Sequence, residues 1–155
     1  MSFRIQGLPV DRFRHLYGAS DAVLAAHGAR RCRVDKTPGF PDRIELRDLE
    51  PGETALLLNY AHQPADTPYR SAHAIFVREG AERSYDRFGE VPEAMRIRPI
   101  SLRAFGADHC MVDADLVDGT ELRALVLRFL ARADVAYLHA HYAKRGCFAA
   151  RIDRA

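Results

Sequence analysis

Apolar residues recur at helical spacing between residues 120 and 133, and this is the clearest periodic pattern in the chain. The positions at three- and four-residue intervals are Leu122, Leu125, Val126, Phe129, Leu130 and Ala133. Such spacing places all of them on one face of a helix. Arg123, Arg128 and Arg132 fall mostly off that face, as solvated side chains do. The pattern therefore predicts a long amphipathic helix, Thr120–Ala133, with Asp118 or Thr120 as its cap.

Most other apolar segments are short and rich in residues that favour strands. The predicted strands are Phe3–Leu8, Cys32–Asp35, Arg43–Leu49, Thr54–Tyr60, His73–Glu79, Ile100–Phe105, Cys110–Val117, Val135–Tyr142 and Cys147–Ile152. The turn sequence EPGE predicts a hairpin between Arg43–Leu49 and Thr54–Tyr60. Two short helices are expected after the first strand, one beginning at Pro9 and one at Asp21–His27 with Ser20 as N-cap.

The connections between these strands are mostly too short for parallel crossovers. The expected fold class is therefore α+β, with a largely antiparallel sheet, two short N-terminal helices and the Thr120–Ala133 helix packed on the sheet. A length of 155 residues is sufficient for one domain with a substantial core, so we expect residues 1–155 to form a single globular domain.

Composition narrows the class of protein. A hydrophobic fraction of 48% with 28% charged residues is typical of a globular chain. The net charge of +2 and the scattered arginines argue against a nucleic-acid partner. No apolar segment reaches membrane-spanning length, and the N-terminus lacks the pattern of a signal peptide. We therefore expect a cytoplasmic protein, with no membrane partner and with Cys32, Cys110 and Cys147 reduced.

Polar and titratable residues are concentrated between two predicted strands, in the segment 62–73. His62, Arg70 and His73 lie there, together with two prolines that restrict the backbone. Loops held by a rigid sheet often carry binding and catalytic groups. Arg70 suits a carboxylate or phosphate, or else an ion pair with Asp66. His73 suits a general base, or else a hydrogen bond to a backbone carbonyl.

His139 and His141 are two residues apart on a predicted strand, so both imidazoles point to the same side of the sheet. Such a pair can begin a metal site, since neutral imidazole is a common zinc ligand. The third ligand would have to come through the tertiary fold, from His62, His73, Asp113 or Asp115. The glutamate that the cupin pattern expects after HxH is absent, so that family is not supported. The alternative is a pair of histidines on a solvent-facing or pocket-facing side of the sheet. The sequence does not identify a metal or a cofactor.

Two further groups have both a chemical and a structural interpretation. Asp113 and Asp115 share a strand face and could hold a cation, but aspartates before a helix are also common capping residues. Cys147 could pair with the histidines as a nucleophile if the hairpin loop has three residues. A two- or four-residue loop pairs Tyr142 with Cys147 and places the thiol on the opposite face.

Two segments, NYAHQPADTPYRSAHAIFVRE and YLHAHYAKRGCFAARID, resemble an uncharacterised bacterial family, the domain of unknown function 1203. The resemblance runs over nearly the whole chain. It implies a single domain from a bacterial cytoplasm and carries no assigned activity, cofactor or catalytic residue.

These observations favour a domain that binds a small molecule in a His- and Arg-lined pocket, in which Arg70 would hold an anionic group. For catalysis, the candidate acid–base residues are His73, His139 and His141. The candidate ligand-binding residues are His62, Arg70, Asp113 and Asp115. We expect one of His62, Arg70 and His73 within about 8 Å of His139 or His141, the range of a diagonal cross-strand neighbour. The alternative is a non-catalytic interaction or structural module that forms a homodimer.

Overall fold

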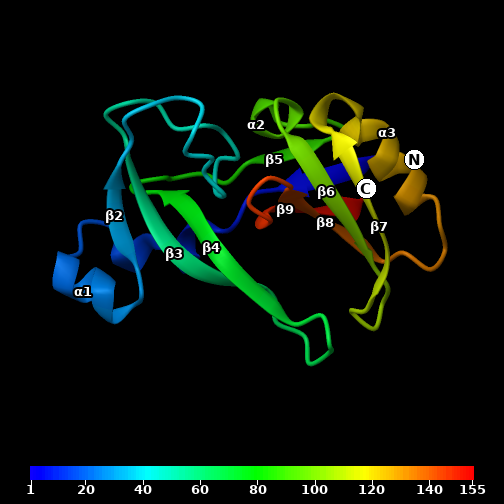
Figure 1. The fold of residues 1–155 in the computed structure, drawn as a ribbon, viewed down its shortest axis with the longest axis horizontal. Helices are drawn as coiled ribbons and strands as arrows, with labels where there is room; N and C mark the ends of the chain where they lie inside the picture. Colours follow the sequence, from blue (N-terminus) through cyan, green and yellow to red (C-terminus); the bar gives the residue numbers. More distant parts are fainter.

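Nine strands form two antiparallel sheets, which confirms the α+β class and the largely antiparallel pairing. The structure, a computed structural model, describes residues 1–155. The larger sheet has the order β5–β1–β9–β8–β6–β7 (Figure 1). Its strands are β1 (Phe3–Gln6), β5 (Asp86–Phe88), β6 (Pro99–Phe105), β7 (Met111–Asp118), β8 (Tyr137–Tyr142) and β9 (Cys147–Arg154). The smaller sheet, β2–β3–β4, consists of β2 (Arg30–Arg33), β3 (Thr54–Gln63) and β4 (Ser71–Arg78).

The predicted amphipathic helix is α3 (Leu122–Leu130), and it packs on one face of the larger sheet (Figure 1). Its buried residues are Leu122, Leu125, Val126, Phe129 and Leu130, as the spacing predicted, whereas Ala133 lies beyond the helix and is exposed. The helix is shorter than Thr120–Ala133 at both ends. Asp118 accepts hydrogen bonds from the backbone and hydroxyl of Thr120 and starts a 3₁₀ turn, Gly119–Glu121, ahead of the helix. At the other end, α3 ends at Leu130, and Arg154 donates to the carbonyls of Leu130 and Arg132.

The N-terminal region differs from the prediction of two short helices. Residues after Pro9 form two 3₁₀ turns, Val10–Arg12 and Arg14–Leu16, in place of the first helix. The second helix is α1 (Asp21–Ala26), and Ser20 caps it by accepting a hydrogen bond from the Val23 backbone. A third short helix, α2 (Glu93–Arg96), follows Pro92. None of the helices has the length and apolar character needed to cross a membrane.

The predicted hairpin between Arg43–Leu49 and Thr54–Tyr60 is wrong, since residues 43–49 form no strand and β2 pairs with β3 instead. The cause is Asp42, a buried carboxylate that accepts hydrogen bonds from the backbone of Glu45 and of Arg78. These bonds bend the segment, and Leu46 takes a positive φ of 52°.

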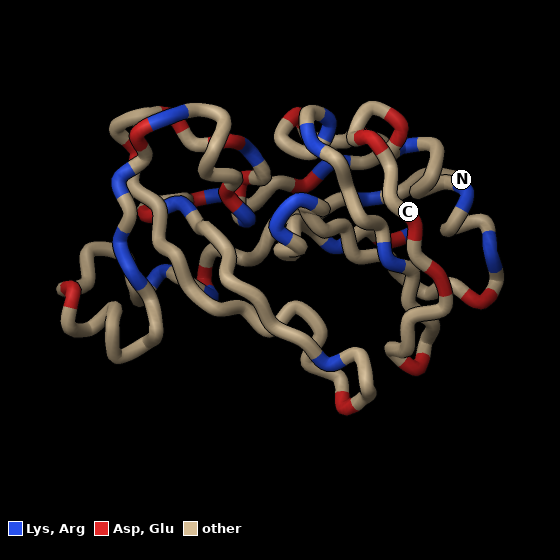
Figure 2. The backbone as a smooth tube through the Cα atoms, viewed as in Figure 1, with Lys and Arg blue, Asp and Glu red and all other residues tan.

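Two large hydrophobic cores correspond to the two sheets, and a third, small cluster consists of Val34, Leu49 and Ala55. The first lies between the larger sheet and α3, and the second lies between the smaller sheet and the N-terminal turns. Phe148 of β9 belongs to the second core and so joins the two sheets. A hydrogen bond of 2.9 Å from the Gln63 side chain to the Tyr137 hydroxyl makes a second connection. Charged residues of both signs are distributed over both halves of the molecule (Figure 2).

Candidate metal centre

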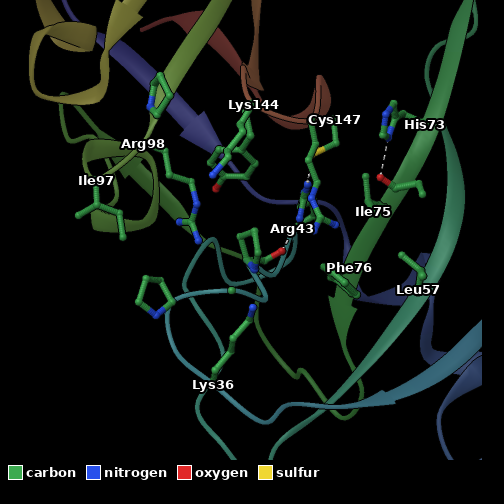
Figure 3. A pocket seen from close by; sticks show the side chains of 17 residues that line it. Lys36, Arg43, Leu57, His73, Ile75, Phe76, Ile97, Arg98, Lys144 and Cys147 are labelled. Carbon is green, nitrogen blue, oxygen red and sulfur yellow. Dashed lines mark hydrogen bonds between the residues drawn. The ribbon is translucent and has the colours of Figure 1, made fainter.

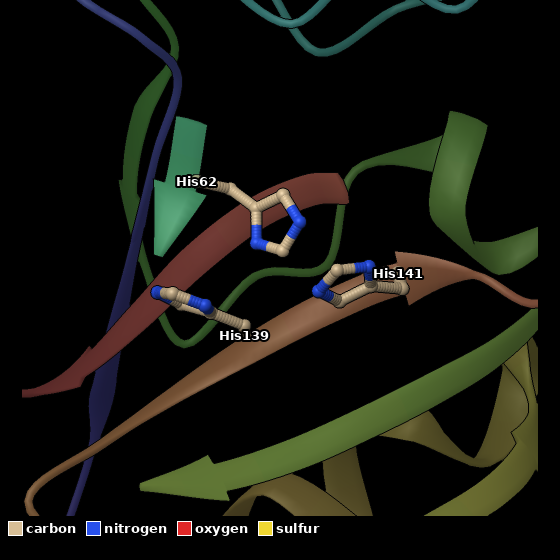
Figure 4. Close-up of side chains that lie close together, drawn as sticks. All are labelled: His62, His139 and His141. Carbon is tan, nitrogen blue, oxygen red and sulfur yellow. The ribbon is translucent and has the colours of Figure 1, made fainter. Parts of the chain in front are cut away.

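Three buried histidines from two sheets meet where the sheets face each other (Figure 4). His139 and His141 come from β8 and His62 comes from the end of β3. The ring centroids of His62 and His141 are 4.8 Å apart, and those of His62 and His139 are 6.1 Å apart. This confirms the expectation that a residue of the 62–73 segment lies within about 8 Å of the HxH pair.

A β-bulge brings His62 to this position. Tyr60 pairs with His73 and Gln63 pairs with Ser71, so two residues of β3 stand opposite one residue of β4. A bulge of this kind turns a side chain out of the regular alternation. The result is that His62 points from the smaller sheet toward the histidines of the larger sheet.

A second bulge, at Ala149 in β9, shapes the other side of the site. His141 pairs with Phe148, whereas Ala140 pairs with Ala150, so Ala149 has no partner. Without this extra residue, Phe148 and Ile152 would lie on the same face. With it, Ile152 joins the core under α3 while Phe148 faces the histidines. The Phe148 ring is stacked on the His62 ring at 5.6 Å with an interplanar angle of 4°.

Each of the three histidines has a buried ring nitrogen without a hydrogen-bond partner. The Nδ1–H of His141 donates to the Gly146 carbonyl at 2.9 Å, which places the lone pair on Nε2. That Nε2 is buried and has no partner. His62 Nε2 contacts the Ser71 hydroxyl at 3.3 Å, and Nδ1 is buried without a partner. Nδ1 of His139 is buried and unpartnered as well.

The arrangement has the donor set of a zinc site. One nitrogen from each ring lies within 4.8 Å of the other two. A tetrahedral zinc ion with bonds of about 2.0–2.1 Å holds its ligand atoms roughly 3.3 Å apart. To bind such an ion, the three nitrogens would have to approach one another by up to about 1.5 Å. The bond from His141 to Gly146 is the kind of second contact that orients a metal-bound histidine.

Electrostatics keep the three imidazoles neutral. Burial lowers the pKa of His62 to about 4 and those of His139 and His141 to about 3. Burial is the largest cause of each lowered pKa, and the positive charge of Arg103 contributes to all three. Neutral imidazole is the form that binds a metal, whereas a histidine with a pKa near 3 is a weak general base at neutral pH.

A cavity of about 510 Å³ opens beside this centre, with His62, His139 and Phe148 in its wall. Arg12 and Arg151 also line it. Arg151 pairs with Asp153 at 2.9 Å, and Arg12 lies over the Tyr60 ring at 4.9 Å. The half-buried Arg103 has no acidic partner and makes one long contact, of 3.4 Å, with Ser101. The surroundings of the three histidines are therefore positively charged.

A model of the family described as "Protein of unknown function (DUF1203)" matches residues 39–154 of the chain. The chain belongs to this family. The DUF1203 region contains all three histidines and both bulges, while residues 1–38, which supply β1, α1 and β2, lie outside it. Neither curated proteins nor solved structures matched the chain.

The other candidates within the DUF1203 region lie outside the histidine cluster. Arg70 is exposed in the loop between β3 and β4 and forms no ion pair with Asp66. His73 lies in β4, and its Nδ1 donates to the Ala74 carbonyl at 2.9 Å. Asp113 pairs with Arg132 and Asp115 pairs with Arg128, on the sheet face that α3 covers. Of the four proposed third ligands, the structure therefore brings His62 to the HxH pair.

Cys147 is separated from the histidines by strand parity. The β8–β9 loop has four residues, Ala143–Gly146, and Tyr142 pairs with Cys147. The thiol consequently lies on the opposite face, which rules out the Cys–His pair considered above. The sequence analysis missed Arg103 and Phe148. Alternation along the strand Ile100–Phe105 places Arg103 at a central position, where a charged side chain signals a polar site.

Proposed function

We propose that the chain binds a divalent transition-metal ion, zinc by preference, through His62, His139 and His141. The observation that carries this proposal is the convergence of three buried imidazole nitrogens that have no other partner. Leaving buried polar nitrogens unsatisfied is costly, and one ion would satisfy all three. Imidazole also suits copper, nickel and iron, so the choice of zinc rests on its abundance at such sites and its tetrahedral geometry.

We further propose that the bound ion receives a small anionic molecule in the adjoining cavity. Three protein ligands leave a fourth position open, as in catalytic zinc sites. Neutral ligands leave the ion with its full positive charge, and Arg103 adds another charge without an acid to balance it. An oxyanion at the open position would be attracted by both. The ion would supply Lewis-acid chemistry there, or an activated water.

Cobalt titration of metal-free protein tests the metal site. The protein, treated with chelator, should take up one Co²⁺ per chain and give the strong visible absorption of four-coordinate cobalt. His139→Gln and His141→Gln should each weaken uptake by about 100-fold or more, because each removes one of three ligands. His15→Ala, which changes an exposed histidine outside the cluster, is the matched control.

Ser71→Ala tests the contact behind His62 and should weaken cobalt binding by about 10-fold, as such supporting contacts do. Circular dichroism of each variant checks that it is folded.

Phosphate added to the cobalt protein should change its spectrum, and Arg103→Gln should weaken that change. Stoichiometry well below one, or equal uptake by wild-type protein and His139→Gln, contradicts the proposal. The alternative of a non-catalytic homodimeric module predicts both of these contrary results.

A further inference from the structure

A second cavity, of about 550 Å³, lies on the other side of the β8–β9 hairpin (Figure 3). Its walls come from the loop that contains Lys36 and Arg43, from β4, and from the Ala143–Gly146 loop. Basic residues from these separate segments line it, and no aspartate or glutamate does. Figure 3 shows Lys36, Arg98 and Lys144 reaching toward the same space from different directions. A cavity lined in this way is suited to negative charge.

Arg43 is the most unusual residue of this cavity. Its side chain is 1% exposed, yet it forms no ion pair with a carboxylate. It donates to the Phe148 carbonyl at 2.8 Å, to the Pro41 carbonyl and to the Cys147 Sγ at 3.0 Å. Each of its three nitrogens has one acceptor, but no acidic group neutralises its charge. A buried charge without a counter-ion is unfavourable, so an anion in the cavity would stabilise it.

Tyr142 provides a second, independent sign of a ligand. Its ring lies between two guanidinium groups, 5.0 Å from Arg43 and 5.1 Å from Arg98. The residue is 4% exposed, and its hydroxyl is buried with no hydrogen-bond partner. Burial raises the pKa of Tyr142 to about 12, so the hydroxyl keeps its proton. The Tyr142 hydroxyl is thus a donor in the wall of a basic cavity, and an anionic ligand would give it an acceptor.

The other basic residues of the cavity differ in whether an acidic group already balances their charge. Arg98 is held by Asp48 through two bonds of 2.6 and 2.8 Å, so that acid balances its charge. Lys36, Lys144 and Arg145 are exposed and form no ion pair. They are free to turn toward a ligand at the mouth of the cavity. Ile97, Phe76 and Leu57 add apolar surface to the wall.

We propose that this cavity binds a small organic oxyanion, a phosphate monoester or a carboxylate attached to a compact apolar group. The Tyr142 hydroxyl donates to the oxyanion, Lys36 and Lys144 neutralise it at the mouth, and the field of Arg43 stabilises it from below. The apolar group lies against Phe76 and Ile97. This site is separate from the three-histidine centre and does not depend on a metal there, because Tyr142 lies on the opposite face of β8 from His139 and His141.

Calorimetric titration with phenyl phosphate, benzoate and inorganic phosphate tests the proposal and separates the two oxyanions. At least one of the two aromatic anions should bind with a dissociation constant below about 1 mM and more tightly than inorganic phosphate, because its ring contacts the apolar wall. Tyr142→Phe and Lys144→Ala should each weaken binding by about 10-fold, the value of one hydrogen bond or charge contact. Arg83→Ala removes the same charge as Lys144→Ala from an exposed position outside the cavity and should have no effect.

The Tyr142→Phe variant also separates a binding role from a structural role. Because the hydroxyl has no partner in the free protein, its removal should leave the thermal midpoint unchanged or higher. With metal removed from both proteins, His139→Gln should bind the anion as tightly as the wild-type protein, so failure of the metal proposal would not affect this result. Absence of binding, or equal affinity in wild-type, Tyr142→Phe and Lys144→Ala proteins, overturns the proposal. Binding of inorganic phosphate alone, weak and unchanged by the variants, overturns it as well.

Discussion

At the scale of single residues, the three histidines combine burial with the lack of a hydrogen-bond partner. Their pKa values lie at about 3 to 4, whereas the unfolded chain titrates near the ordinary value of 6.5. Between these values the unfolded chain binds protons that the folded chain does not. The histidines therefore contribute their full stabilisation above pH 6.5. The free energy of unfolding falls as the pH is lowered from 6.5 toward the folded-state pKa values.

Chemical denaturation in the presence of chelator should show this dependence. Lowering the pH from 7.5 to 5.5 should remove up to about 1.4 kcal/mol per histidine, or roughly 4 kcal/mol for the three. Asp42 acts in the opposite direction, because burial raises its pKa. His141→Gln should show a smaller decrease than the wild-type protein by up to about 1.4 kcal/mol. Equal unfolding free energies at the two pH values would show that the rings are not held neutral.

Sequence reasoning identified part of the site at this scale, because alternation along a strand is a local property. It placed His139 and His141 on one face and included His62 among four candidates for the third ligand. It could not choose among those four, since the choice depends on a bulge in β3 that no residue type marks. Arg43 and Tyr142 were missed for a related reason. Each gains its chemical meaning from burial against segments about 100 residues distant or from a missing partner, and neither is visible in a linear pattern.

At the scale of elements, the bulges in β3 and β9 do most to build the site. Each adds one residue to a strand and reverses the faces of the residues that follow it. The bulge at Ala149 allows one strand to serve both cores, with Phe148 in the second and Ile152 in the first. Apolar spacing predicted the position of β9 and its pairing with β8. It could not predict the change of face within β9.

The apolar face of α3 was predicted correctly because its spacing is regular, although the helix is shorter than predicted. Phe129 lies at the centre of that face and is 4% exposed in the core under the larger sheet. Phe129→Ala should lower the free energy of unfolding by about 3–5 kcal/mol, through lost burial and the cavity that remains. Urea denaturation of wild-type and variant proteins measures the difference. Arg123→Ala, on the solvated side of the same helix, should change stability by less than about 0.5 kcal/mol.

At the scale of the whole molecule, the sequence indicated the α+β class but not the division into two sheets. Strand order depends on contacts between distant segments, such as β1 with β9 and β2 with β3. The segment 41–49 shows the limit most clearly. Its alternating pattern is that of a strand, but the buried Asp42 carboxylate binds two backbone amides and bends it into the wall of the second cavity.

The Ala143–Gly146 loop belongs to both proposed sites. Its Gly146 carbonyl fixes the His141 ring, and its Lys144 lines the anion cavity. An oxyanion held by Lys144 would restrict the loop and keep the carbonyl in place for His141. When one ligand has ordered the loop, the other ligand no longer loses free energy in ordering it. The two ligands should therefore bind with positive cooperativity.

Thermodynamic linkage makes this cooperativity reciprocal and so gives two independent measurements of one quantity. Saturating phenyl phosphate should tighten cobalt binding by about 5-fold or more, and saturating cobalt should tighten phenyl phosphate binding by the same factor. Lys144→Ala should reduce both factors together. If neither ligand changes the affinity for the other, the loop is already rigid. The protein would then have two independent binding sites on opposite faces of one hairpin.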